Sequence, residues 1–332
     1  MEKYLKRAII FLILLFVAVG VLIFIKGAKT FSVVSTGDSL FDPSKDKRWD
    51  ILILGNRGET APSGGVLTDS VMVLSYQGET KKAAIFSIPR DLWVEIPGYG
   101  YEKINYAYAA GFNSTGDSKK GIKLAKEVVK NVTGLDIDFV LVIDVEGLKE
   151  IVDAVGGITI YEDKYFYENF YGHPVQIYPG QNHLNGDEVM GYVGMRRYDS
   201  DFQRMRRQQK VILALKDKIL SSGTFLNPDK LWQIFNATQK HIRTDLNASQ
   251  IRYLIQNASK FEVDSVEQVV FDTENYLYAS YSPQGAYILI PKSGDFSQIK
   301  EVFQNVFEEG KSQANETEMP TFEEEKINKV GN

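Results

Sequence analysis

An uninterrupted apolar run near the start of the chain constrains the protein more than any other sequence feature. Residues Ala8 to Ile25 read AIIFLILLFVAVGVLIFI and include no charged side chain. As an α-helix, this run covers about 27 Å, close to the thickness of a bilayer core. Lys3, Lys6 and Arg7 precede the run, which favours an N-terminus inside the cell and a body outside it. We therefore predict a single-pass cell-membrane anchor and an extracytoplasmic domain.

A cleaved signal peptide is the alternative interpretation of the same run. Signal peptides have an apolar part of about 7–15 residues, followed by a cleavage site made of small residues. The run here is longer, and the Gly27-Ala28-Lys29-Thr30 stretch that follows it is a poor cleavage site. Lys26 and Lys29 weaken the charge asymmetry across the run but do not reverse it. The sequence therefore favours the uncleaved anchor.

The rest of the chain divides into a stalk, one large domain and a tail. Residues 1–28 contain the predicted cytoplasmic stub and transmembrane anchor, and residues 29–49 are polar, as expected of a stalk. Residues 50–310 contain the apolar patterns that are typical of strands and helices. Residues 311–332 are rich in glutamate and poor in apolar side chains, which predicts a disordered acidic tail.

Predicted strands and helices alternate through residues 50–310. Continuous apolar runs predict strands covered on both faces at 50–54, 70–76, 82–88, 139–143, 158–161, 266–271 and 286–290. Helical spacing predicts helices at 104–110, 118–132, 145–155, 187–196, 201–220, 227–238, 247–259 and 296–307. The stretch from Tyr165 to Leu184 is rich in Tyr, Asn, Gly and Pro, and we expect a long surface loop there. The alternation predicts an α/β fold: a three-layer α/β/α sandwich with a mixed central sheet.

Composition disfavours several classes of protein. The formal net charge is −5, whereas a protein that binds nucleic acid over its whole surface is normally basic, so we expect no nucleic-acid partner. The chain has no cysteine, which excludes disulfides and thiolate metal sites. Its three histidines are too scattered to suggest a zinc site.

The densest basic cluster begins at Arg196 and ends at Lys210. Arg204 and Gln208 are four residues apart and therefore share one face of the predicted helix, while an apolar stripe forms a separate face. Arginine is the residue best suited to bidentate contacts with phosphate. An ordinary solvated helix face is the alternative, and from composition alone it is the more common outcome.

Two shorter patches follow predicted elements. Ser87-Ile88-Pro89-Arg90-Asp91 ends an apolar strand, and strand ends are where sites form in open α/β sheets. Lys103-Ile104-Asn105 opens the next predicted helix, whose exposed amides favour anions. A surface ion pair and a plain helix start are the respective alternatives.

Seven motifs, in this order and spacing, resemble the LytR-CpsA-Psr family, also known as the cell envelope-related transcriptional attenuator domain. They are ILILG at 51–55, TDS at 68–70, SIPRD at 87–91, KIN with AYAAG at 103–111, VDAVGG at 152–157, HLNGDEVMGYV at 183–193 and DFQRMRRQQ at 201–209. The resemblance implies an α/β/α domain on a membrane anchor, in agreement with the patterns above.

The resemblance also implies an activity, a site and partners. The family transfers phospho-glycopolymers from a polyprenyl-pyrophosphate carrier to peptidoglycan or another cell-wall acceptor at the cytoplasmic membrane. Carried over by motif, the pyrophosphate-binding residues are Arg90, Lys103, Arg196, Asp201, Arg204, Arg207 and Gln208. The implied catalytic residues are Asp69, Arg90 and Arg196, with the isoprenoid tail in an apolar tunnel beneath the sheet. Asp69 also helps to hold Mg²⁺ in this reading.

Three departures from the family pattern affect this implied site. Arg57 stands where the family has a metal-binding Asp, Leu67 replaces an Arg, and Gly194 replaces the first Arg of an Arg-x-Arg pair. With a two-residue deletion, Arg57 instead matches a nearby Arg of the family, and in either alignment the first acidic metal ligand is missing. Either Glu59 supplies the missing carboxylate of a Mg²⁺ site, or the Arg57 guanidinium takes over the charge of the metal. The departures keep a second function open: a catalytically impaired envelope protein that binds polyprenyl phosphates without turnover. A third, transcriptional regulation, is disfavoured by the acidic charge and predicted external location.

Overall fold

The computed structural model describes residues 48–59, 61, 65–170, 172–195, 200–221, 238–247, 250 and 263–308. The predicted anchor, nearly all of the stalk and the acidic tail lie outside these residues, as do most of the helices predicted at 227–238 and 247–259. Within the described residues, no helix is long and apolar enough to cross a bilayer. The predicted domain boundaries therefore stay predictions.

A six-stranded mixed sheet forms the centre of the domain, in the order β11-β6-β1-β2-β3-β12. The pairs β1–β6 and β3–β12 are parallel, and the other three pairs are antiparallel. This confirms the predicted mixed α/β fold. The strands are β1 (Arg48–Asn56), β2 (Ser70–Gln77), β3 (Lys82–Ile88), β6 (Phe139–Asp144), β11 (Ile242–Thr244) and β12 (Ser265–Val270).

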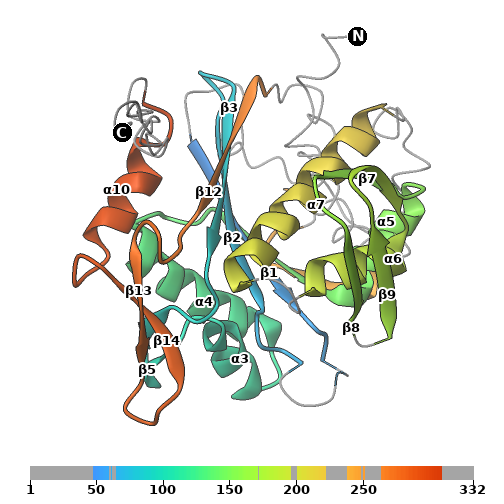
Figure 1. The fold of residues 1–332 in the computed structure, drawn as a ribbon. Helices are drawn as coiled ribbons and strands as arrows, with labels where there is room; N and C mark the ends of the chain where they lie inside the picture. Colours follow the sequence, from blue (N-terminus) through green and yellow to red (C-terminus); the bar gives the residue numbers. More distant parts are fainter. Residues whose placement is uncertain are drawn as a thin grey trace, which may run out of the picture.

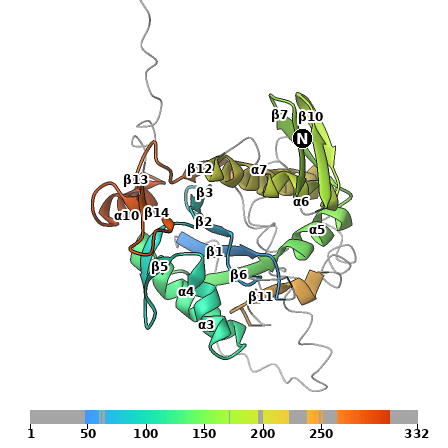
Figure 2. The same cartoon turned by 60° about the horizontal axis from the view of Figure 1, so that its bottom comes forward.

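Helices cover both faces of the sheet. Successive side chains of β1 point to opposite faces, and because both sets are apolar, both faces must be covered. Leu52 and Leu54 belong to one buried cluster, and Ile51 and Ile53 belong to the other. Figures 1 and 2 show the two helical layers on either side of the strands. The first layer contains α3 (Tyr106–Asn113), α4 (Ser118–Thr133) and α10 (Ser297–Asn305), and the second contains α5 (Val145–Ala154), α6 (Gly186–Gly194) and α7 (Asp201–Ser221).

The predicted loop from Tyr165 to Leu184 is wrong. The stretch contains β8 (Phe166–Phe170), β9 (His173–Ile177) and β10 (Gly180–Leu184), and β10 pairs with β7 (Ile158–Glu162). Along β9 and β10, exposed side chains alternate with more buried ones, which is the period of a half-buried strand. The many turn-forming residues belong to tight turns between short strands. These residues interrupt the alternation, so the sequence analysis did not detect it.

Two further hairpins border one end of the domain. One joins β4 (Trp93–Ile96) to β5 (Gly100–Lys103), and the other joins β13 (Leu277–Tyr281) to β14 (Tyr287–Pro291). The sequence predicted only β14. A backbone hydrogen bond from Leu289 N to Asp91 O (2.9 Å) attaches the second hairpin to the segment that follows β3. Both hairpins therefore lie beside the end of the central sheet.

Candidate functional site

The direction of three strands gathers charged residues at one edge of the sheet. Because β2 is antiparallel to both β1 and β3, the C-terminal ends of β1 and β3 meet the N-terminal end of β2. Arg57 follows β1, Asp69 precedes β2 and Arg90 follows β3. Two hydrogen bonds fix the turn after β1. Gly58 N donates to Asn56 Oδ1 (3.0 Å), and Arg57 N donates to Gly65 O (3.0 Å).

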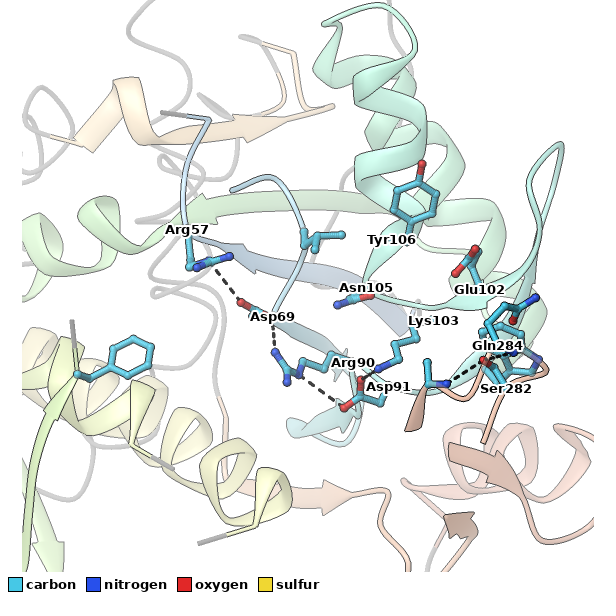
Figure 3. Close-up of a pocket in the computed structure, with 14 residues that line it drawn as sticks. Arg57, Asp69, Arg90, Asp91, Glu102, Lys103, Asn105, Tyr106, Ser282 and Gln284 are labelled. Carbon is cyan, nitrogen blue, oxygen red and sulfur yellow. Dashed lines mark hydrogen bonds and ion pairs between the residues drawn. The ribbon is translucent and has the colours of Figure 1, made fainter. Parts of the chain in front are cut away.

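The Asp69 carboxylate lies between two guanidinium groups. Arg90 Nη1 is 2.6 Å from Asp69 Oδ1, and Arg57 Nε is 3.9 Å from Asp69 Oδ2. Figure 3 shows the two arginines approaching this side chain from opposite sides. Arg57, which stands where the family has an acidic residue, therefore directs a positive charge at the carboxylate expected to bind a metal.

Arg90 is the hub of a larger charge network. Its Nε lies 3.7 Å from a carboxylate oxygen of Asp91 and 3.7 Å from one of Asp201. Burial lowers the pKa of Arg90, but Asp201, Asp69 and Asp91 outweigh burial and raise the pKa above its ordinary value. Among the described residues, this buried Nε has no hydrogen-bond acceptor. Lys103 Nζ joins the network 2.6 Å from Asp91 Oδ1.

The first turn of α7 contributes Asp201 and Arg204. Arg204 is buried, with only 3% of the residue exposed. Its Nη2 lies 2.8 Å from Asp201 Oδ1 and donates a hydrogen bond to the backbone oxygen of Asp69 (3.1 Å). Gln209 fastens the helix to the sheet, since its Nε2 donates to Ser87 Oγ (2.8 Å) and Val269 O (3.0 Å). The DFQRMRRQQ motif thus contains both site residues and Gln209, a contact to the sheet that was not predicted.

The network contains four cations, Arg57, Arg90, Lys103 and Arg204, and three carboxylates, Asp69, Asp91 and Asp201. The network therefore has a net charge of +1. A ligand with two or more negative charges can displace carboxylates from these donors, which suits a phosphate or diphosphate.

Two hollows meet at this network. An open basin of about 580 Å³ is lined by Arg57, Asp69, Arg90, Asp91 and Lys103, among others. An apolar cavity lies between the sheet and α7. Its walls include Ile53, Met72 and Leu74 from the sheet, and Val211, Ile212 and Leu215 from α7. Arg57, Asp69 and Phe170 line both hollows, and Arg204 and Gln208 line the apolar cavity. A charged basin therefore opens beside an apolar cavity.

Most of the predicted pyrophosphate-binding residues that the structure describes converge, but Arg207 is placed differently. Arg207 lines neither hollow: its guanidinium donates to Tyr192 O (3.1 Å) and Met195 O (2.6 Å) and holds the end of α6. Its burial against α6 explains why a residue three positions from Arg204 has a different environment. Arg196 lies outside the described residues.

Phe170, from the unpredicted β8, occupies the space beside Gly194. A Cβ atom at Gly194 would lie 2.2 Å from Phe170 Cδ1, so no larger side chain fits there unless the ring moves. At the position of the family's Arg, this chain therefore has an aromatic neighbour at the junction of the two hollows. The sequence of β8, FYENF, does not alternate between apolar and polar residues, so it held no simple signal for this neighbour.

The described residues do not fit a Mg²⁺ site. They contain no group of three or more His, Cys, Asp or Glu side chains able to hold a metal ion. Glu59, the proposed substitute ligand, instead pairs with Arg243 at 3.2 Å. Both Asp69 oxygens face guanidinium groups, which leaves this carboxylate neutralised by arginine. The second alternative, in which Arg57 supplies the positive charge, stays a prediction.

Comparison with known proteins identifies the family. Residues 25–305 match the sequence model of the LytR_cpsA_psr family. The chain belongs to this family. It is 32% identical over 209 residues to the regulatory protein MsrR of Staphylococcus aureus, a match that covers 62% of this chain and 59% of MsrR. The chain thus spans less than two thirds of that relative.

Other members of the LytR_cpsA_psr family are named for a transfer reaction. The chain is 31% identical over 232 residues to the polyisoprenyl-teichoic acid–peptidoglycan teichoic acid transferase TagU of Bacillus mycoides, covering 66% of this chain and 70% of TagU. The crystal structure of B. subtilis TagV superposes with a TM-score of 0.62 at 26% identity, over 79% of this chain and 97% of TagV.

Proposed function

We propose that this protein transfers a phospho-glycopolymer from a polyprenyl-pyrophosphate carrier to peptidoglycan or another cell-wall acceptor. The observation that carries the proposal is the junction of a guanidinium-rich basin with an apolar cavity at Arg57 and Asp69. A lipid diphosphate has these two parts, a dianionic head and an apolar tail. The names of relatives such as TagU support the same class of reaction. A membrane anchor at residues 1–28 would place the site at the outer face of the membrane.

The proposed step breaks the phosphoanhydride bond of the diphosphate and forms a phosphodiester bond to the acceptor. An acceptor hydroxyl oxygen attacks the glycan-bearing phosphorus, a new P–O bond forms, and the bond to the bridging oxygen breaks. Polyprenyl phosphate leaves with the electron pair, and the hydroxyl proton passes to water in the open basin. Arg90, Arg57 and Arg204 lower the barrier by neutralising charge on the phosphates, since such transfers depend on positioning and electrostatic stabilisation.

A non-catalytic lipid-phosphate-binding protein is the second candidate, favoured by the loss of an acidic residue at Arg57 and of an Arg at Gly194. Incubation of the full-length protein with a radiolabelled glycan on polyprenyl pyrophosphate and with peptidoglycan separates the two. We expect label in the peptidoglycan. Binding of the carrier with no label transferred would support the second candidate and contradict the transferase.

The same assay tests how the site manages without a second metal-binding carboxylate. Because Arg57 faces Asp69, we expect transfer by the wild-type protein to be unchanged by EDTA. Arg57→Ala should lower the rate about 100-fold, the effect of removing one preorganised donor. Arg57→Asp restores an acidic pair with Asp69, so its transfer should require added Mg²⁺. Loss of wild-type activity in EDTA, restored by Mg²⁺, would contradict the role of Arg57 and revive the metal site at Asp69.

A further inference from the structure

The end of the basin farthest from Arg57 is built from different chemistry. Figure 3 shows Glu102, Ser282 and Gln284 together at this end, with Arg57 at the other. Trp93 of β4 lines this end, and Ser282 and Gln284 belong to the loop between β13 and β14. The two hairpins lie side by side, since Leu92 pairs with Leu289, and together they form this end of the hollow. We call these four residues the hairpin subsite.

Aromatic rings gather on both hairpins although the core does not need them. Tyr101 is 61% exposed and stacks on Trp93, with ring centroids 6.4 Å apart and planes 28° apart. Tyr281, next to Ser282, is 72% exposed and meets Tyr287 edge to face at 6.4 Å. Of these rings, Trp93 lines the hollow and Tyr101 stacks against it, so the hollow has an aromatic edge of the kind found in binding surfaces. Their electron-rich faces attract weakly positive groups such as the C–H faces of sugar rings.

The polar groups of the hairpin subsite suit a neutral, hydroxyl-rich ligand. The Glu102 carboxylate repels phosphate but accepts hydrogen bonds from hydroxyl groups, and the Gln284 amide both donates and accepts. Ser282 adds a hydroxyl. Aromatic faces beside amide, hydroxyl and carboxylate groups match a saccharide rather than a second anion.

We infer that the hairpin subsite binds the acceptor glycan. This inference rests on the proposed transfer, in which the attacking and leaving oxygens lie roughly in line across the phosphorus. The leaving polyprenyl phosphate extends towards the apolar cavity, which opens at Arg57, Asp69 and Phe170. The attacking hydroxyl must approach from the opposite end, where Trp93 and Gln284 lie. The occupant is a linear N-acetylated glycan strand, which can extend outwards from the open basin over the two hairpins.

Binding of a soluble sugar tests this subsite without lipid or phosphate. The probe is a β-1,4-linked tetramer of N-acetylglucosamine, titrated into the full-length protein and followed by ligand-observed NMR. We expect saturable binding, weakened about tenfold by Trp93→Ala through loss of ring stacking. Gln284→Ala should weaken binding as well, and since this side chain is exposed, the variant is expected to fold even if the Trp93 variant does not. Tyr161→Ala, an exposed tyrosine on the distant β7, is the matched control and should bind like wild type.

A fourth variant separates this inference from the proposed function. Arg90→Met removes the hub of the charge network but leaves the hairpin subsite, so sugar binding should persist while binding of the lipid diphosphate is lost. Tetramer binding that is absent in the wild type, or equal in the Trp93, Gln284 and Tyr161 variants, would overturn the subsite. A wild-type protein that does not bind the lipid diphosphate carrier would instead overturn the proposed function.

Discussion

Replacing Arg90 with methionine is expected to weaken binding of a polyprenyl pyrophosphate about 100-fold, within the range observed when one member of a buried charge pair is truncated. Arg90 touches Asp69 at 2.6 Å and lies 3.7 Å from both Asp91 and Asp201. Its removal lowers the net charge of the network from +1 to zero and leaves three carboxylates facing the ligand. Isothermal titration with geranylgeranyl pyrophosphate measures the loss.

Arg206→Met is the matched control for this experiment. Arg206 lies on the same helix as Arg204 but pairs with Asp272 at 2.7 Å and lines neither hollow. We expect its affinity for the lipid diphosphate to stay within about twofold of wild type, because this pair lies outside both hollows. Thermal unfolding of the variant measures the cost of leaving the buried Asp272 without Arg206. Equal losses for the two variants would show that general positive charge, rather than the network around Asp69, holds the ligand.

Filling the apolar cavity is expected to have the second large effect. Val211 lies on α7, is buried and lines the cavity, so Val211→Phe places a ring where the lipid tail would lie. At about 0.8 kcal/mol per buried methylene, exclusion of one five-carbon isoprene unit costs about 4 kcal/mol, or several hundredfold in affinity. The phosphate contacts are untouched, so the affinity for inorganic pyrophosphate should remain at the wild-type value.

Leu213→Phe supplies the comparison, because Leu213 is on the same helix, packs against the same core and does not line the cavity. Thermal unfolding of both variants accounts for the cost of overpacking, about 1–3 kcal/mol. If Val211→Phe leaves the affinity for geranylgeranyl pyrophosphate intact, the tail binds elsewhere.

The central strands were predictable because they are buried on both faces. Residues 51–54, 71–74 and 139–143 form continuous apolar runs, which only a covered strand explains well. The short hairpins were not. Their strands have only four or five residues each, many of them exposed, and closely spaced turn residues leave pieces too short to recognise. The error from Tyr165 to Leu184 therefore concerns the part of the fold that supplies Phe170.

The site was predictable only in part for a similar reason. Arg90 and Asp69 follow from strand ends and motifs, and the contact of Arg204 with Asp69 agrees with the implied pocket. The burial of Arg207 against α6 depends on tertiary packing, and helical spacing in the sequence does not show which helix packs against a residue. The sequence left two alternatives open for the metal site, one of them with Arg57 in place of the metal. The ion pair between Arg57 and Asp69 depends on the geometry of the loop after β1, which the sequence does not show.

A crystal structure of the full-length protein with geranylgeranyl pyrophosphate tests the central claim most directly. We predict diphosphate oxygens within about 2.7–3.2 Å of the Arg90 and Arg204 guanidinium nitrogens, with the tail between Met72 of the sheet and Val211 of α7. A diphosphate bound away from these arginines, or a tail lying outside the apolar cavity, would contradict the account.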